Sequence, residues 1–523
     1  MPGRPRVRFF VCFAFAMLVV VGGTFFWPRN APPQEHANPP APVFGAASPW
    51  LHVDSPPTVP TDYPGRVVLL WFWRATSIHS LHAVPDVLAL ERRFADDGLV
   101  MIGVHTGRYA GEASSARVRS AAERLKISMP LVIDVDHSIA SGYGVRVWPT
   151  FVLIGADGGV IGSTFGEGRF DLLANAIEQA LADAVEVSRV ERRAAVAQTR
   201  RGLLAPTMVV ASPTAVDARG RVFISDAGRG CVVEATYPDE EGRSTFVREI
   251  AGIGGGPMHD PQGLAFDAAA GVLYVAERSA HRVLAVDLVR GETEILAGTG
   301  MPGHDRRGGG AGREQALNSP VGLALAPDGS TVFATLAGLH QVWSIDVATG
   351  QARAMAGSGR SMPMDGSLDT AAFAQPWGLA ISADGTRLYV ADSESSSIRV
   401  IEGQSVRTLT ADDDSALRET AARSTLPQVV LQHPRGAAIR ETSAGDAVVV
   451  ADAMVPGLVT IEGTRSRSIL LMTDDSGAEV IEPAGVCAAS DGRIFLVDIV
   501  GRRVLMFEPD GSAWRPVAIA GLE

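Results

Sequence analysis

The stretch VVLLWFWRATSIHSLHAVPDVLALE, residues 67–91, decides the fold of the first part of the chain. Residues 66–73 include a continuous apolar run, which is typical of a central strand covered on both faces. After a short break, apolar residues recur at helical spacing and predict an amphipathic helix. These helical positions are Leu81, Val84, Val87, Leu88 and Leu90. The stretch therefore predicts a strand–turn–helix unit with the residues TSIHS (76–80) beside the turn.

Strand and helix patterns alternate from there to about residue 184. Short apolar runs bounded by turn residues predict strands, and longer periodic segments predict helices. The alternation implies an α/β layer with a largely parallel sheet. The further predicted strands are LVMIGVHT (99–106), PLVIDVD (130–136) and two strands within 148–168, and the further helices are SSARVRSAAERLK (114–126) and a segment that begins near Phe170.

This order of elements resembles the thioredoxin-like fold, and most closely the thioredoxin-like domain of the NHL-repeat-containing protein 2 family. Further resemblance lies in the pair Pro85 and Asp86, in GVH at 103–105 and in WPT at 148–150. Relatives show a Cys-Cys-Ile-Asn-Cys-Leu-His segment before that Pro-Asp pair. This chain has Thr76, Ser77 and Ser80 where the three cysteines fall, and it keeps Ile78, Leu81 and His82.

The missing sulfurs bear directly on activity. Thiol–disulfide exchange needs a thiolate nucleophile and a sulfur leaving group, and a hydroxyl supplies neither. A serine acts as a nucleophile only beside a positioned base and an oxyanion site; His79 and His82 are near in sequence, but no third member is visible. The resemblance also implies a buried acid six residues before the first cysteine of the pair, and Trp71 stands there. We therefore expect a degenerate, redox-inactive domain.

The resemblance implies a cis-proline at Pro149, between Trp148 and Thr150 and beside the degenerate motif. In the family this region accepts extended peptide through its backbone, so a shallow peptide-sized groove is expected here. Because cis X-Pro bonds are rare, this expectation rests on the resemblance alone. No metal or cofactor is predicted, since the histidines match no closed zinc pattern. These histidines are His79, His82, His105 and His137.

From about residue 203 the chain repeats with a period of 48 to 59 residues. Each unit opens near a proline and contains short strand-like runs separated by turns, often with glycine. Four strands per unit, repeated six times, indicate an all-β six-bladed propeller, which hides sheet edges by radial repetition. The opening prolines are Pro213, Pro261, Pro320, Pro376, Pro434 and Pro483, with Gly263, Gly322, Gly378, Gly436 and Gly485 two residues later in five units. LLAPTMVV (203–210) is a candidate further strand at the closure of the ring.

Strand ends such as RLYVAD (387–392) and the long loops between units resemble NHL repeats. The resemblance therefore covers roughly residues 64–523 in the domain order of the family. It implies a thioredoxin-like domain followed by an NHL propeller, with a link to redox homeostasis or envelope quality control that a chain without the motif cysteines would at most regulate.

An acid ends the second strand of most units, and we interpret it as a turn cap because it recurs once per blade. These acids are Asp226, Glu277, Asp392, Asp452 and Asp498. His259 and His433 precede two of the opening prolines and are candidate residues of a propeller mouth. A metal site there would need about three convergent ligands and an acid or base, which the pattern does not supply.

The N-terminus carries Arg4, Arg6 and Arg8, followed by an uncharged run over residues 9–27. As a helix this run spans roughly 28 Å, about the thickness of the hydrocarbon layer. The arginines favour a cytoplasmic N-terminus, so we expect one transmembrane helix as a single-pass anchor in a bacterial inner membrane, with the bulk of the chain in the periplasm. The alternative is a signal peptide that is cleaved to release the protein into the periplasm.

The predicted organisation has five parts. A proline-rich segment after the anchor is expected to form a semi-rigid stalk. The parts are an anchor or signal segment (1–29), a Pro-rich linker (30–63), a thioredoxin-like domain (64–184), a linker helix (185–202) and a six-bladed NHL-repeat propeller (203–523).

Three functional hypotheses follow. A net charge of −12 argues against a nucleic-acid surface. The first hypothesis is a non-catalytic, envelope-anchored scaffold that docks protein or peptide partners. The second is a metal-dependent hydrolase or lyase acting in the propeller channel. The third, a thiol–disulfide oxidoreductase, is disfavoured without a CxxC motif and would have to pair Cys231 with Cys487.

Overall fold

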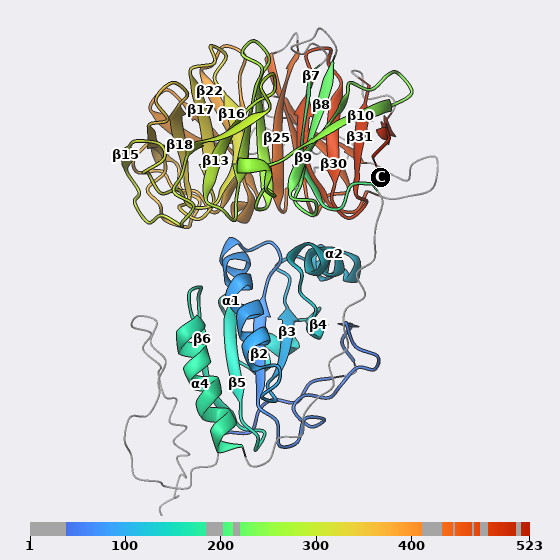
Figure 1. Cartoon of the computed structure of the whole chain (residues 1–523), viewed down its shortest axis with the longest axis vertical. Helices are drawn as coiled ribbons and strands as arrows, with labels where there is room; N and C mark the ends of the chain where they lie inside the picture. Colours follow the sequence, from blue (N-terminus) through green and yellow to red (C-terminus); the bar gives the residue numbers. More distant parts are fainter. Residues whose placement is uncertain are drawn as a thin grey trace, which may run out of the picture.

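The computed structural model describes residues 38–45, 47–184, 202–212, 220–409, 431–442, 445–462, 465–470, 480–508 and 514–522. An α/β domain is stacked on one face of a β-propeller, with helices α1 and α2 nearest to the propeller (Figure 1). The predicted anchor (1–29) and most of the predicted linker helix (185–201) lie outside the described residues. Within the described ranges, no helix has the length and apolar character needed to cross a membrane.

The α/β domain contains one six-stranded sheet in the order β1-β4-β3-β2-β5-β6. Its strands are β1 (Trp50–Leu51), β2 (Val68–Trp73), β3 (Val100–His105), β4 (Leu131–Ile133), β5 (Thr150–Ile154) and β6 (Val160–Phe165). Its helices are α1 (Ile78–Phe94), α2 (Ser115–Leu125), α3 (Ser138–Gly142), α4 (Phe170–Asp183) and the short 3-10 helix η1 (Ala110–Ala113). This arrangement confirms the predicted thioredoxin-like α/β domain.

The sheet is mixed, and the expectation of a largely parallel sheet was wrong. Strands β2, β3 and β4 run parallel, whereas β1, β5 and β6 pair antiparallel with their neighbours. The strands β5 and β6 form a hairpin through the turn at Gly158, whose φ of 78° suits glycine. The alternation of strand and helix, which implies parallel pairing, stops at this hairpin.

The central strand β2 is buried along its whole length, as predicted. Trp71 and Trp73 face the layer that contains α1 and α4, and their rings stack at 4.9 Å between centroids. Phe72 faces the opposite layer with Ile102 and Val152. Trp71 thus fills with an apolar ring the position where the resemblance implies a buried acid.

The segment from residue 38 to residue 63 is not a free stalk. Strand β1 pairs with β4 at the edge of the sheet, and Phe44 pairs with Val59 in an isolated bridge. Val59 is fully buried in the same core layer as Phe72. The expected linker (30–63) therefore contributes to the α/β domain from residue 38 onward, because Ala41, Leu51 and Val59 are buried in the core layers of the domain.

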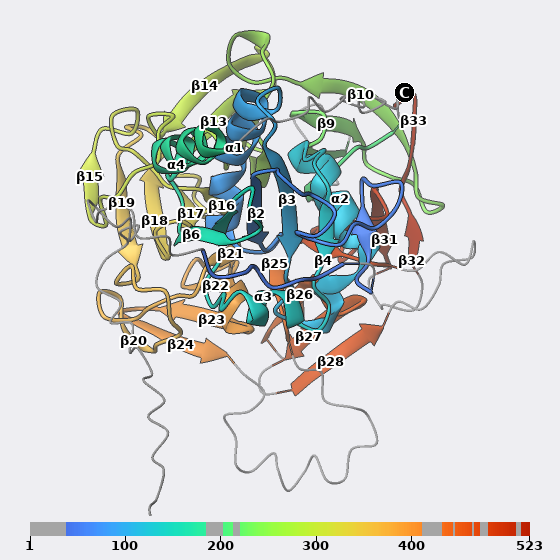
Figure 2. The ribbon, with the colours of Figure 1, turned by 90° about the horizontal axis from the view of Figure 1, so that it is seen from below.

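The propeller has six blades arranged around a central axis, with the α/β domain over one end of that axis (Figure 2). Blade one contains β7 (Pro206–Ser212), β8 (Arg221–Asp226), β9 (Cys231–Thr236) and β10 (Arg243–Ile250); blade two contains β11 (Pro261–Asp267), β12 (Val272–Glu277), β13 (Arg282–Asp287) and β14 (Glu292–Ala297); blade three contains β16 (Pro320–Leu325), β17 (Thr331–Leu336), β18 (Gln341–Asp346) and β19 (Ala352–Ala356). Blade four contains β21 (Pro376–Ile381), β22 (Arg387–Asp392), β23 (Ser397–Glu402) and β24 (Ser405–Leu409); blade five contains β25 (Pro434–Thr442), β26 (Gly445–Asp452), β27 (Gly457–Glu462) and β28 (Arg465–Leu470); blade six contains β29 (Pro483–Ala488), β30 (Ile494–Asp498), β31 (Arg503–Phe507) and β32 (Trp514–Pro516). Short additional elements are β15 (Gly308–Gly310), β20 (Gly366–Ser367), β33 (Ala518–Ala520) and the 3-10 helices η2 (Ile253–Gly255) and η3 (Ser393–Ser395).

The first blade opens at Pro206 and not at Pro213, which lies outside the described residues. Pro206 pairs with Asp226 at the end of β8, as Pro261 pairs with Glu277 in the second blade. The stretch LLAPTMVV thus supplies the inner strand of blade one. Ring closure is completed by β33, which joins the outer strand β10 in parallel.

All five glycines that follow the opening prolines lie where inner strands of adjacent blades approach each other. A Cβ at Gly322 would lie 2.3 Å from the carbonyl oxygen of Trp377 in the next blade. A Cβ at Gly436 would lie 2.3 Å from the carbonyl oxygen of Ala484. The repeated glycine therefore serves the close backbone packing around the axis.

Candidate functional site

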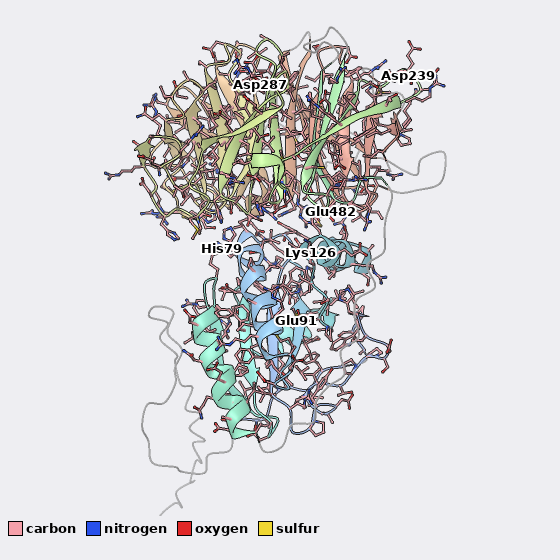
Figure 3. All side chains as sticks on the ribbon, in the orientation of Figure 1. His79, Glu91, Lys126, Asp239, Asp287 and Glu482 are labelled. Atoms are coloured by element: carbon pink, nitrogen blue, oxygen red, sulfur yellow. The ribbon has the colours of Figure 1, made fainter. Side chains whose placement is uncertain are left out.

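The degenerate motif lies at the junction of the two domains. Figure 3 shows His79 at the propeller end of α1 and Glu482 on the facing end of the propeller. The side-chain Oε1 of Gln375 accepts the N–H of Ile78 at 2.7 Å, and its Nε2 donates to the carbonyl of Thr76 at 2.8 Å. The propeller thereby binds the backbone on both sides of Ser77.

Apolar contacts surround this pair of hydrogen bonds. Ile78 and Leu81 pack against Val321, Ala337 and Trp377 of the propeller. Ile78 is fully buried, so the first turn of α1 is inserted into the mouth of the propeller. Burial of this apolar surface stabilises the contact between the two domains.

The three positions that replace the cysteines differ in access. Thr76 and Ser80 are buried, while Ser77 is half-buried. The hydroxyl of Ser80 accepts the N–H of Arg74 at 3.2 Å, and the hydroxyl of Thr76 donates to Glu112 at 3.3 Å. These hydroxyls therefore serve as local structural groups at the start of α1.

Two histidines on α1 contact a carboxylate of the same domain. His82 Nδ1 lies 2.6 Å from Glu167 Oε2, and His79 Nδ1 lies 3.6 Å from the same atom. Burial alone would raise the pKa of Glu167, but hydrogen bonds and charge from His79 and His82 outweigh it and hold that pKa well below its usual range. Glu167 follows β6, so the loop before α4 brings it beside the first turn of α1.

His82 also reaches the propeller. Its Nε2 lies 2.5 Å from the hydroxyl of Ser319, the residue before the opening proline of blade three. The result is a hydrogen-bonded chain of Glu167, His82 and Ser319 that joins the two domains. Ser319 is fully buried, so its hydroxyl orients His82 and is enclosed by protein.

Two propeller histidines line this junction. The rings of His82 and His281 lie 5.7 Å apart, and those of His79 and His340 lie 5.9 Å apart. The imidazole of His281 accepts the backbone N–H of Ser319 through Nδ1, and that of His340 accepts the backbone N–H of Gln375 in the same way. Burial, with repulsion from the facing histidine, lowers the pKa of both His281 and His340 to about 4.

Polar contacts extend the junction outward. Arg108 binds the carboxylate of Glu394 at 2.7 Å, and the hydroxyl of Tyr109 lies 2.5 Å from that of Ser396. Arg117 on α2 donates to the carbonyl of Ile481. Contacts on several blades fix the α/β domain against the propeller.

The predicted cis-proline region lies beside the motif. The Trp148–Pro149 peptide bond is cis, as the resemblance implies. Pro149 is buried, and the guanidinium of Arg74 lies 4.3 Å from the centroid of the Trp148 ring. Thr150 is buried and donates to the carbonyl of Val147 at 2.7 Å.

The two predicted propeller-mouth histidines do not come together with further ligands among the described residues. The His259 side chain is exposed, and its backbone N–H donates to Glu277 at 2.8 Å. The His433 ring is fully buried, and neither of its nitrogens has a hydrogen-bond partner among the described residues. Burial, reinforced by Arg435, lowers the pKa of His433 well below its ordinary value.

The prediction that the recurring acids cap turns is confirmed for Asp226 and Asp452, whereas Glu277 and Asp498 accept an N–H group before the inner strand and bind an arginine of the third strand. Asp226 accepts the N–H groups of Leu204 and Ala205 before β7 and that of Gly228 in the following turn. Asp452 does the same in blade five, with partners before β25 and after β26. These two carboxylates thus tie the start of an inner strand to the turn after the second strand. The sequence had indicated only the contact with the turn.

The two cysteines in the described residues are free thiols within the propeller. Cys231 in blade one and Cys487 in blade six pack in the same core cluster. Burial raises the pKa of both thiols to about 12, which leaves little of the reactive thiolate. Cys12 lies outside the described residues.

The fold and the junction define a two-domain protein in which a thioredoxin-like domain is docked on a β-propeller. Sequence comparison supports both halves. The AhpC/TSA family matches residues 51–162, and the NHL repeat matches residues 373–401.

Longer relatives span both domains. The chain is 30% identical over 486 residues to Protein SUPPRESSOR OF QUENCHING 1, chloroplastic, from Arabidopsis thaliana. The matched region covers 87% of this chain and 45% of that protein. The chain is 26% identical over 502 residues to NHL repeat-containing protein 2 from Homo sapiens, which covers 87% of this chain and 68% of that protein. Protein DipZ from Mycobacterium tuberculosis is 35% identical over 147 residues, 28% of this chain and 21% of that protein. The chain spans about half the length of the plant relative and about two thirds of the human one, and it is similar to both over 87% of its own length.

Proposed function

We propose that this chain is a binding protein that docks protein or peptide partners and does not exchange disulfides. The observation that carries the proposal is the engagement of the motif by Gln375, which bonds to Thr76 and Ile78 on either side of Ser77. A thioredoxin-type oxidoreductase must present this helix end to a substrate disulfide. In this chain the same helix end contacts the propeller.

The chemistry of the junction supports the same proposal. Hydroxyl groups at Thr76, Ser77 and Ser80 cannot form the mixed disulfide through which thiol–disulfide exchange proceeds. The thiols of Cys231 and Cys487 belong to the propeller core and carry raised pKa values. The family setting then favours a regulatory link to redox homeostasis or envelope quality control.

Partners would bind on surfaces that the α/β domain leaves open. The propeller face remote from that domain presents loops held by rigid strands (Figure 1), an arrangement suited to recognition. One of these loops exposes Val289, which has 71% of its surface accessible, beside Asp287 at that end of the propeller (Figure 3). An exposed apolar residue beside charged groups fits a peptide-binding rim better than a catalytic centre.

Crosslinking in intact cells, followed by identification of captured proteins, tests the docking role. A defined set of partners, reduced by a Val289→Asp substitution, would support it. Recovery of bulk envelope proteins alone would contradict it. Turnover of a disulfide substrate by the purified, sequence-verified soluble portion would overturn the distinction from an oxidoreductase.

We also propose that residues 1–29 anchor the protein, with the two domains in the periplasm. The support is the run of uncharged residues 9–27 behind Arg4, Arg6 and Arg8. Membrane fractionation with protease treatment of spheroplasts tests the topology. A membrane-bound chain whose propeller is digested from outside supports the anchor, whereas a soluble mature chain that starts after residue 29 supports the cleaved signal.

A further inference from the structure

We propose that His79, His82 and Glu167 form a binding site for a zinc-like divalent cation at the junction of the two domains. His79 and His82 lie about one turn apart at the start of α1, and Glu167 lies in the loop between β6 and α4. One ligand atom from each residue lies within 4.8 Å of the other two. Imidazole nitrogen and carboxylate oxygen are the donors that zinc takes in sites with three protein ligands. This inference is independent of the docking role proposed above.

The spacing of the donor atoms suits a small cation. Ligand atoms in a tetrahedral zinc site lie roughly 3.3 Å apart, given metal–ligand distances of about 2.0–2.1 Å. His79 Nδ1 and Glu167 Oε2 are already 3.6 Å apart. The 2.6 Å contact between His82 Nδ1 and the same oxygen is a hydrogen bond. A rotation of the carboxylate would lengthen this distance to the spacing of a metal site.

Ser319 supports His82 from the propeller side. A hydroxyl both donates and accepts, so the 2.5 Å contact with His82 Nε2 persists in either tautomer of the ring. When Nδ1 binds a cation, Nε2 carries the proton of the ring and donates a hydrogen bond to the hydroxyl of Ser319. Metal-bound histidines commonly have such a second hydrogen bond, which fixes the orientation of the ring.

The neighbouring histidines define the limits of the site. His281 and His340 accept backbone N–H groups through Nδ1, which leaves the proton on Nε2 and removes that nitrogen as a ligand. The side chains of His79 and Glu167 are 43% and 36% exposed, so one side of the cluster opens to solvent. A fourth coordination position is therefore available to water.

Metal binding by the purified, tag-free protein tests the proposal with zinc and cobalt(II) salts alone as probes. We expect one equivalent of zinc to bind, and cobalt(II) to show the intense visible absorption of a tetrahedral site. His79→Ala and Glu167→Gln should each abolish stoichiometric binding. Ser319→Ala, which removes only the orienting hydroxyl, should weaken binding by about 10–100-fold.

His304→Ala is the matched control, because His304 is exposed and is not one of the three clustered ligands. Its zinc affinity should equal that of the unsubstituted chain. Circular dichroism and melting curves check that each variant is folded; His79 and Glu167 are exposed enough for substitution without loss of the core. The absence of a one-to-one zinc complex, or unchanged affinity in both His79→Ala and Glu167→Gln, would overturn the assignment.

Discussion

The side chain of Gln375 occupies the place of a helix cap at Ser77. Ser77 precedes α1 in extended conformation, and its own side chain makes no capping hydrogen bond. The first N–H groups of a helix need partners from outside the helix. Gln375 is the residue before the opening proline of blade four, and its Oε1 accepts the N–H of Ile78 at 2.7 Å. The start of the α/β domain's main helix therefore depends on the propeller.

The substitution Gln375→Ala should weaken the junction. It leaves the N–H of Ile78 and the carbonyl of Thr76 buried without partners, and each such group costs about 1–3 kcal/mol. We expect a lower urea midpoint for the α/β domain and faster proteolysis between the domains. Gln351→Ala is the control, since the exposed side chain of Gln351 makes one hydrogen bond among the described residues, from Nε2 to the carbonyl of Gly309, and its loss should change stability by less than about 0.5 kcal/mol. Equal effects of the two substitutions would contradict the capping role.

The sequence predicted the elements of both domains but not the junction between them. Local periodicity identified β2, α1 and the blade repeat, because these patterns come from burial along a single element. The contact of Gln375 with Ile78 joins residues 297 positions apart, and no local pattern encodes it. Glu167 likewise stands in a polar loop without a signal of its own.

One signal for the junction was present in the repeat. Residues just before the opening prolines face the mouth of the propeller, and Ser319 and Gln375 both contact the α/β domain from this position. The sequence pattern predicted that His433, which precedes Pro434, is a residue of the propeller mouth. This prediction did not extend to Ser319 and Gln375, which precede the opening prolines of other blades. The assignment of Pro213 to the first blade failed for a related reason. Blade one has Met208 where the other inner strands have glycine, so Pro206 lacked the expected companion.

Restoring sulfur at positions 77 and 80 should not restore an oxidoreductase. In the variant Ser77→Cys with Ser80→Cys, the second thiol would replace a fully buried side chain, beneath a helix turn that packs on the propeller. We expect slow labelling by a thiol reagent under native conditions and no detectable turnover of insulin disulfides. Addition of Gln375→Ala should accelerate labelling by loosening the cover. Turnover comparable with a thioredoxin standard would show that the junction opens readily and would remove the main support for the proposed function.

The substitution Gly322→Ala should disrupt the propeller ring. Its Cβ would lie 2.3 Å from the Trp377 carbonyl oxygen, and backbone in the next blade must move to relieve the clash. Overpacking of this kind costs about 1–3 kcal/mol and occasionally more, so a clear fall in melting temperature or insoluble expression is expected. Gly256→Ala is the matched control: its φ is −77° and its nearest neighbour is 3.5 Å away. A similar melting temperature for the two variants would contradict the role of the inner-strand glycines.

The substitution His105→Gln should reduce the acid sensitivity of the chain. His105 is buried at the end of β3, and its Nε2 accepts the N–H of Ala75 at 3.2 Å. Burial, with repulsion from Arg74, lowers its pKa from 6.5 to about 3. Between these two values the unfolded chain binds a proton that the folded chain does not, so the free energy of unfolding falls as pH falls, by up to about 1.4 kcal/mol per pH unit from this group. Glutamine keeps an acceptor for Ala75 without titrating, so urea titrations at pH 7, 6, 5 and 4 should show a shallower decline for His105→Gln. The exposed His304→Gln is expected to follow the unsubstituted chain, and a decline in His105→Gln as steep as in that control would mean that another group causes the acid sensitivity.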